Sequence, residues 1–349
     1  MGVGQLSYEM GAKMENVKFP YKIEEQKKEE QIAQLFNYWR KNGFPNYKKE
    51  DYDHKKELAK VSNFDESRIL RGNDLEQTMH GCGFLWTYFP HWVDVRCGND
   101  NSVRENWADD QKLFALIQKT YNWEIKHGNG FFTVNRIRQN AKVYCSKQSV
   151  SNFRPTVAKY IYNKYGNCGI VWDMSCGFGG RLLGFLSSNC KKYIGTEPAQ
   201  KTFNGLLEMK ADFEYVGKEI ELYQIGSECF FPEKETIDLC FTSPPYFDTE
   251  KYSEEKEQSY IKFPTKEEWV NGFLKKTLEN CFFGLKSSGY LILNISNVKS
   301  FNNLEEVAIE TAQNCGFVLE DTLYLVLSSI SGKGKKKEPV FVFKKAVQR

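Results

Sequence analysis

The chain has 349 residues, which is long for one domain and about right for two. Its net charge of +3 neither requires nor excludes a nucleic-acid partner, because a basic face can be balanced by an acidic one elsewhere. With 41% hydrophobic residues, no apolar signal core and no membrane-length apolar run, the sequence predicts a cytoplasmic globular protein without a membrane partner.

The N-terminal part predicts an accessory domain over residues 1–145. Within 24–43, Ile32, Leu35, Phe36 and Trp39 recur at helical spacing and Gly43 follows, so we expect an amphipathic helix there. From 70 to 145 the sequence is rich in aromatic residues, Gly, Asn and Asp, and it has no clear period. The fold class of this domain is therefore predicted as α-rich and irregular.

Beyond residue 146 the pattern changes to alternating strands and helices. Helices are expected at 155–166, 181–188, 201–217, 265–286 and 303–315, and strands at 169–175, 192–198, 221–227, 236–243 and 290–296. Such alternation predicts an α/β fold with a doubly wound, Rossmann-like parallel sheet over 146–349. The last two strands, within 316–345, are joined without a helix and should pair antiparallel at or next to one edge.

The first two strands of this domain carry the features of a nucleoside site. The first ends at Asp173 and runs into a turn with Gly177, Gly179 and Gly180, which lets the backbone approach a ligand closely. The second ends at Glu197, where a carboxylate can accept hydrogen bonds from both ribose hydroxyls. No phosphate-binding loop with the GxxxxGK[ST] pattern is present, so an adenosine-type ligand without a triphosphate is implied.

The strand at 236–243 runs into the segment Thr-Ser-Pro-Pro-Tyr. Two prolines cannot continue a central strand, so it must end at Ser243 and leave the sheet beside the cofactor site. The Ser243 hydroxyl and the Pro244 carbonyl can each accept one N–H of an exocyclic amine, which directs the nitrogen lone pair at an electrophilic methyl group. The ring of Tyr246 can stack on a base swung out of a duplex.

At these residues the chain resembles the DNA amino-methyltransferases, which modify N6 of adenine or N4 of cytosine. TSPPY is similar to their [DNS]-PP-[YFW] signature, DMSCGFGGR to their glycine-rich cofactor motif, and YIGTEP to their acidic second-strand motif. The resemblance covers about 150–345 and implies S-adenosylmethionine as cofactor and double-stranded DNA as partner. It also admits a partner from a restriction or defence system.

The resemblance assigns roles to individual residues. The catalytic ones are Ser243, Pro244, Pro245 and Tyr246. The cofactor-binding ones are Asp173, Gly177, Phe178, Gly179 and Glu197, with Ser227 or Glu228 near the adenine and Arg154, Pro155 and Thr156 by the methionine moiety. Phe178 is included because Met174-Ser175 replaces the family's usual Pro-Phe, so that an aromatic contact has to come from elsewhere.

The order of motifs predicts where DNA is recognised. The cofactor and catalytic motifs are too close for a recognition domain between them, so this role falls to 1–145. The segment 247–265 should close over the target base, with Asp248, Lys251 and Tyr252 as candidates to touch it. The lysine-rich 331–338 is either a phosphate contact or a bare hairpin tip.

Several alternatives remain open. Ser before Pro-Pro favours cytosine N4 as the target, with adenine N6 as the alternative. Other substrates are guanine N2 of RNA or a glutamine side chain of a protein, and a further alternative is an inactive methyltransferase-like subunit that binds nucleic acid. His80, Cys82, His91 and Cys97 match no familiar zinc-finger spacing, so no metal is expected.

Overall fold

The computed structural model describes residues 17–144, 150–328 and 335–346. The chain forms two compact units, and each is made from two separate stretches of sequence. The smaller unit comprises 1–46 and 91–150, and the larger one comprises 47–90 and 151–349. The structure thus draws the boundary differently from the predicted one at 145/146, because 47–90 belong with the C-terminal stretch.

The smaller unit is mainly helical. In α2 the side chains of Ile32, Leu35, Phe36 and Trp39 are buried, as their spacing predicts, and the helix ends before Gly43, whose positive φ of 75° favours glycine. The α-rich character predicted for this region is confirmed. The elements of this unit are β1 (Tyr21–Lys22), α2 (Lys28–Asn42), β4 (Arg96–Cys97), α5 (Val103–Ala108), α6 (Asp110–His127), β5 (Phe131–Phe132) and α7 (Val134–Tyr144).

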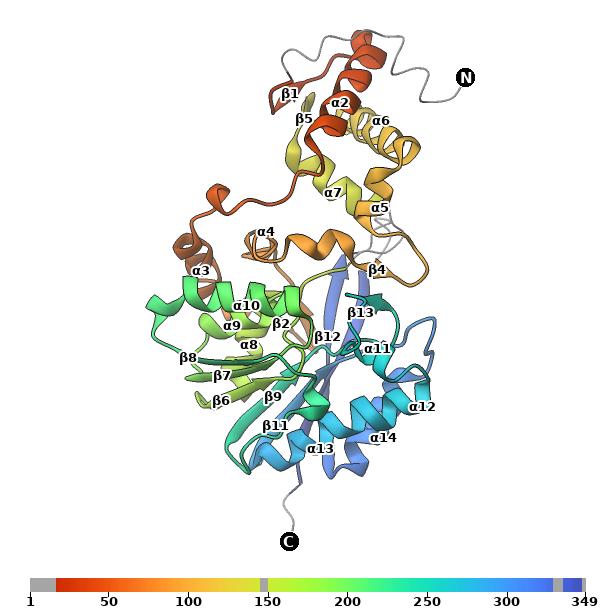
Figure 1. The fold of residues 1–349 in the computed structure, drawn as a ribbon. Coiled ribbons are helices and arrows are strands. Elements are labelled where there is room, and N and C mark those ends of the chain that lie inside the picture. The colour runs from red at the N-terminus through yellow and green to blue at the C-terminus, as the bar shows by residue number, and fades with distance from the viewer. Residues whose placement is uncertain (1–16, 145–149, 329–334, 347–349) are drawn as a thin grey trace. The chain divides into compact units, whose positions relative to one another are not determined.

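The larger unit is built on a mixed sheet, which has nine strands in the described part of the chain, in the order β2-β3-β12-β13-β11-β9-β6-β7-β8. Helices α8 and α9 lie on one face and α13 and α14 on the other (Figure 1). The strands are β2 (Leu70–Arg71), β3 (Asp74–Glu76), β6 (Ile170–Asp173), β7 (Lys192–Thr196), β8 (Glu219–Tyr223), β9 (Ile237–Thr242), β11 (Leu285–Asn294), β12 (Phe317–Ser328) and β13 (Lys335–Lys345).

The strand order confirms the predicted doubly wound, Rossmann-like fold. From β6 the chain steps to β7 and then β8, and it returns to the other side of β6 for β9 and β11, all of them parallel. The order reverses between β6 and β9, and ligands bind at the carboxyl ends of the strands at such a point. Strand β13 is antiparallel to both β11 and β12, as expected for a pair joined without a helix.

The helices predicted beyond residue 155 are present close to their predicted positions, and this unit has further helices within 47–90 and at 259–262 that were not predicted. Helix α8 begins at Pro155 and ends before Gly166, and the predicted helix at 265–286 contains a π-helical turn, η7. The helices are α3 (His54–Ser62), α4 (Cys82–Leu85), α8 (Pro155–Tyr165), α9 (Gly180–Leu186), α10 (Gln200–Asp212), α11 (Ser259–Lys262), α12 (Lys266–Trp269), η7 (Val270–Leu274), α13 (Lys275–Gly284) and α14 (Leu304–Asn314).

The stretch 47–90 joins the larger unit through backbone pairing and buried side chains. Strand β3 pairs in parallel with β12, so this stretch extends the sheet beyond its C-terminal hairpin. The Tyr88 hydroxyl donates to the carboxylate of Asp212 in α10 (2.7 Å), and the Lys159 ammonium of α8 donates to the Ser62 carbonyl (2.6 Å). These bonds are the physical reason that 47–90 do not belong to a separate N-terminal domain.

Candidate functional site

The glycine turn after β6 contains two glycines in the left-handed backbone conformation. Gly177 has φ 55° and Gly179 has φ 71°, a region that other residues rarely adopt. Buried Asn152 clamps the turn from both sides: its side-chain carbonyl accepts from the Gly180 amide (3.1 Å), and its amide donates to the Phe178 carbonyl (2.5 Å). Sequence reasoning missed Asn152, because nothing in its own neighbourhood shows that it meets this turn.

Asp173 lies at the centre of the strand ends. Its carboxylate is fully buried and forms an ion pair with Arg181 of α9 (2.9 Å). It also accepts from the hydroxyl of Tyr193 in β7 (2.8 Å) and from the hydroxyl of Thr242 in β9 (2.9 Å). The side chain predicted to contact the cofactor is therefore occupied within the protein, and it ties β6, β7, α9 and β9 together.

Glu197 follows β7, where the sequence places it. One oxygen of its buried carboxylate accepts from the Gly177 amide (3.0 Å) and the other from the Ala199 amide (3.0 Å). Burial raises the pKa of Glu197 to about 7, against the opposing effect of these two amides. Each oxygen keeps a second lone pair, so the carboxylate can still accept hydrogen bonds from a diol.

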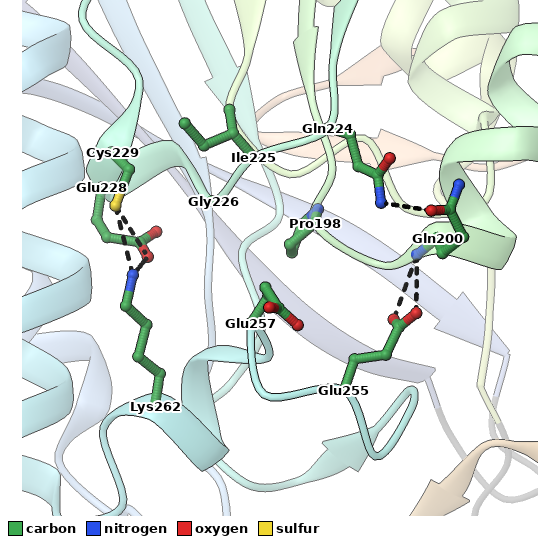
Figure 2. A pocket seen from close by; sticks show the side chains of 10 residues that line it. All are labelled: Pro198, Gln200, Gln224, Ile225, Gly226, Glu228, Cys229, Glu255, Glu257 and Lys262. Atoms are coloured by element: carbon green, nitrogen blue, oxygen red, sulfur yellow. Dashed lines mark hydrogen bonds and ion pairs between the residues drawn. The ribbon is translucent and has the colours of Figure 1, made fainter.

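A pocket of about 440 Å³ opens at the carboxyl ends of β7 and β8 (Figure 2). Pro198, the residue after Glu197, lines it, whereas Glu197 itself does not. This volume lies within the range of roughly 300–1,000 Å³ usual for small-molecule sites. Polar and charged side chains dominate its wall, which suits a ligand rich in hydrogen-bonding groups. The lining residues are Pro198, Gln200, Gln224, Ile225, Gly226, Glu228, Cys229, Glu255, Glu257 and Lys262.

The pocket separates the two candidates for an adenine contact. Ser227 is buried, and its hydroxyl lies 2.8 Å from that of Thr277 in α13. Glu228 lines the pocket, and its carboxylate is paired with Lys262 of α11 (2.6 Å). Of the two, Glu228 is the side chain that a ligand in this pocket would meet.

Of the remaining predicted cofactor residues, Arg154 and Thr156 form hydrogen bonds to the stretch 47–90 and Phe178 packs against it. The Arg154 guanidinium donates to Gln77 (2.5 Å), and the Thr156 hydroxyl lies 2.9 Å from that of Thr78. Pro155 is buried in the first turn of α8. The ring of Phe178 packs against Trp86 with centroids 5.3 Å apart. None of these four residues lines the pocket.

The Ser-Pro-Pro-Tyr turn, predicted to be catalytic, begins where β9 ends. The Thr242 hydroxyl bonds to Asp173, so Ser243 starts the turn beside the glycine loop. The Tyr246 hydroxyl donates to the backbone carbonyl of Asn294, at the end of β11 (3.1 Å), and lies 3.4 Å from the Ser243 hydroxyl. Because the single Tyr246 proton is committed to that carbonyl, Ser243 donates in the second contact and keeps its lone pairs for an incoming N–H.

The surroundings of this turn are partly buried and strained. Pro244 is buried, whereas Ser243, Pro245 and Tyr246 are half-buried. Burial raises the pKa of Tyr246 well above its usual value, so its hydroxyl stays neutral. Phe247 has a φ of 57°, which is unfavourable for a bulky residue, and its ring packs against Trp269 and Phe301.

The segment behind the turn contains the three residues expected to touch a target base. One carboxylate oxygen of Asp248 is buried and has no hydrogen-bond partner among the described residues. The Tyr252 hydroxyl donates to Glu250, and its ring lies 5.9 Å from that of Phe178. Lys251 is half-buried in the short strand β10 (Glu250–Lys251). Residues 331–334 of the lysine-rich tip lie outside the described residues.

The described part of the chain has neither a metal-binding cluster nor a membrane-spanning helix. No group of three or more His, Cys, Asp or Glu side chains is arranged to hold a metal ion. No helix there is both long enough and apolar enough to cross a membrane.

Comparison with known proteins gives structural matches only. No family model and no curated protein matches the chain. A methyltransferase from Methanosarcina mazei that depends on S-adenosylmethionine is 14% identical with a TM-score of 0.40, and the match covers 54% of this chain and 98% of that one. TrmN from Thermus thermophilus is 16% identical with a TM-score of 0.38, and the match covers 55% of this chain and 48% of that one. An O-methyltransferase from Thermotoga maritima is 11% identical with a TM-score of 0.38, and the match covers 57% of this chain and 68% of that one. At such values the matches assign no family, and function is inferred from the residues of the site.

Proposed function

We propose that this chain is an S-adenosylmethionine-dependent methyltransferase that methylates an exocyclic amine of a DNA base, with cytosine N4 favoured over adenine N6. The observation that carries the proposal is the bond between Thr242 and Asp173. It brings the Ser-Pro-Pro-Tyr turn and the glycine loop to one point of the sheet, where the strand order reverses.

The residues present fit the adenosine end of this cofactor. Glu197 offers lone pairs to a ribose diol, and Glu228 offers a carboxylate at the wall of a pocket that is large enough for a nucleoside. Gly177, Gly179 and the clamp from Asn152 keep backbone close to the place where the methionine end would extend. The cofactor, when bound, supplies an electrophilic methyl group.

The chain's own residues prepare the acceptor. The Ser243 hydroxyl and the Pro244 carbonyl accept the two N–H bonds of the amine, which turns its lone pair toward the cofactor side. The bond from Tyr246 to Asn294 fixes the aromatic ring next to Ser243, where it can stack on an extruded base. No covalent bond to the protein is needed, because the amine nitrogen is itself the nucleophile. As it forms the bond to the methyl group, the methyl–sulfur bond would break with S-adenosylhomocysteine as the leaving group, and the surplus N–H proton would be lost to water.

Transfer of label tests the proposal. Protein is incubated with S-adenosylmethionine labelled in its methyl group and, in separate reactions, with unmethylated genomic DNA, total RNA or cell protein. We expect label in DNA, and nucleoside mass spectrometry should find it in N4-methylcytosine. Label in N6-methyladenine would correct the base, and label only in RNA or protein would overturn the DNA substrate. Ser243→Ala protein is the control for contaminating activities.

A further inference from the structure

The adenosine pocket is closed on one side by residues that follow the catalytic turn in sequence. Glu255 accepts hydrogen bonds from the backbone amide of Gln200, the first residue of α10 (3.1 and 3.2 Å). Lys262 extends from α11 to Glu228 across the pocket rim (Figure 2). The segment behind Tyr246 is thus bonded to both walls of the pocket.

The two oxygens of Glu228 have different surroundings. The Lys262 ammonium and the Cys229 thiol both donate to Oε1, at 2.6 and 3.7 Å. Within the described residues no hydrogen bond reaches Oε2, and Figure 2 shows this second oxygen directed toward the open pocket. Only 6% of the Glu228 side chain is exposed, so Lys262 supplies the opposite charge that an ionised carboxylate needs at this depth.

We propose that Lys262 is the positioning residue for adenine recognition: it holds the Glu228 carboxylate oriented so that Oε2 accepts a hydrogen bond from the exocyclic amine of the cofactor's adenine. The inference rests on the proposed function and adds to it a residue that no motif contains. Lys262 itself contacts the carboxylate and not the ligand. Without it, the Glu228 carboxylate would have no partner of opposite charge at this depth and would turn toward solvent, and the preference for an amino-purine would be lost.

A binding comparison tests this role without measuring catalysis. Calorimetry gives the Kd of S-adenosylhomocysteine and of S-inosylhomocysteine, in which the purine amine is replaced by a carbonyl that would face Oε2. For the unaltered protein we expect the adenosyl compound to bind about 10–100-fold more tightly, since the inosyl compound leaves the buried carboxylate oxygen unpaired. In Lys262→Met the ratio should fall to within about threefold of unity.

Matched variants distinguish the positioning of Glu228 by Lys262 from two other effects, the loss of a positive charge in this segment and a loss of folding. Lys256→Met removes an exposed lysine of the same segment and should keep the ratio of the unaltered protein. Lys262→Arg should keep most of it. In a Glu228→Gln background, Lys262→Met should have no further effect on the ratio, because the carboxylate on which it acts is absent.

The outcomes distinguish the inference from the proposed function. If the unaltered protein binds neither compound, both fail. If it prefers the adenosyl compound and Lys262→Met keeps that preference, only the role of Lys262 is wrong. If Lys262→Met does not fold, the cycle is completed with Lys262→Gln, and an unchanged ratio in that variant overturns the inference equally.

Discussion

At Glu197, burial and hydrogen bonding act in opposite directions on one carboxylate. Burial favours the neutral acid, whereas the amides of Gly177 and Ala199 favour the ionised form, and the net result is a pKa of about 7. A ribose diol would add two further donors and so favour the ionised form. Cofactor binding and deprotonation of Glu197 should therefore be coupled near neutral pH.

This coupling predicts a pH dependence of affinity. The ionised fraction of a group with a pKa of about 7 falls about tenfold from pH 8 to pH 6, so the Kd of S-adenosylhomocysteine should rise by about that factor. Calorimetry across this range measures it, and Glu197→Gln should show a flat profile. An equal slope in Glu197→Gln would assign the proton to another group.

The same shift has a defined sign for stability. Because the pKa of Glu197 is higher in the folded chain than the ordinary value of 4.5, the folded state binds a proton that the unfolded chain has lost between these two values. This proton makes the free energy of unfolding decrease as the pH rises from about 4.5 to about 7. Above pH 7 the contribution of Glu197 to the free energy of unfolding no longer changes with pH.

Variants of the catalytic turn separate hydrogen bonding from stacking. Ser243→Ala removes one acceptor for the amine and should lower kcat by about 10²–10³, with cofactor affinity unchanged. Tyr246→Ala should cause a comparable loss. Tyr246→Phe keeps the ring but lacks the bond to Asn294, so most activity should remain if stacking is its main role. Full turnover of Tyr246→Ala on duplex DNA would disprove stacking.

At the scale of elements, α10 depends on close approach to the stretch 47–90. A Cβ added at Gly205 would lie 2.5 Å from the Tyr88 carbonyl oxygen and 2.6 Å from the Phe89 ring. Real side chains do not come this close to backbone, so any larger residue must push the two segments apart. Gly205 therefore reports on whether 47–90 pack on this helix in solution.

Gly205→Ala should destabilise the protein despite the better helix propensity of Ala. Overpacking costs about 1–3 kcal/mol, against a gain of about 1 kcal/mol from replacing Gly within a helix. We expect a net loss of up to about 2 kcal/mol in the free energy of unfolding, measured with urea. Lys201→Ala, an exposed change on the same helix, is the control and should be nearly neutral. A stabilised Gly205→Ala would mean that 47–90 are not packed there.

Local chemistry explains which elements the sequence could predict. Pro244 and Pro245 must end a strand, Gly166 ends a helix, and alternation of strands with helices requires a layered sheet, so each of these could be read over a few residues. Asn152 and Lys262 could not, because the first acts on the turn after β6 and the second on Glu228, 34 positions away in the chain. The sequence also could not show that the Asp173 carboxylate is already hydrogen-bonded within the protein, because three of its partners come from other elements.

At the scale of the whole molecule, the chain enters each unit twice. Residues 47–90 carry buried Leu75, which lies in the strand paired with β12, and they have no periodic pattern that would link them to a sheet whose other strands begin at residue 170. That is why sequence reasoning assigned them to the N-terminal domain. The order of motifs predicts DNA recognition in 1–145, and if recognition lies outside the larger unit, it belongs to the smaller unit and not to the whole of that stretch.

Two deletions give opposite predictions because of this arrangement. Removing 1–145 also removes 47–90, which exposes the edge of β12 and the buried surface of α8 and α10. That protein should be largely insoluble or unfolded.

A chain that begins at Tyr47 and replaces 91–150 with a flexible Gly-Ser linker keeps the larger unit whole, since both ends of the linker lie in that unit. It should fold and bind S-adenosylhomocysteine about as tightly as the full chain, while losing affinity for duplex DNA. Gel filtration and circular dichroism follow folding, calorimetry follows the cofactor, and fluorescence anisotropy with labelled duplex follows DNA. A soluble 146–349 fragment that binds cofactor would show that 47–90 are dispensable, and undiminished DNA binding by the linker protein would place recognition within the larger unit.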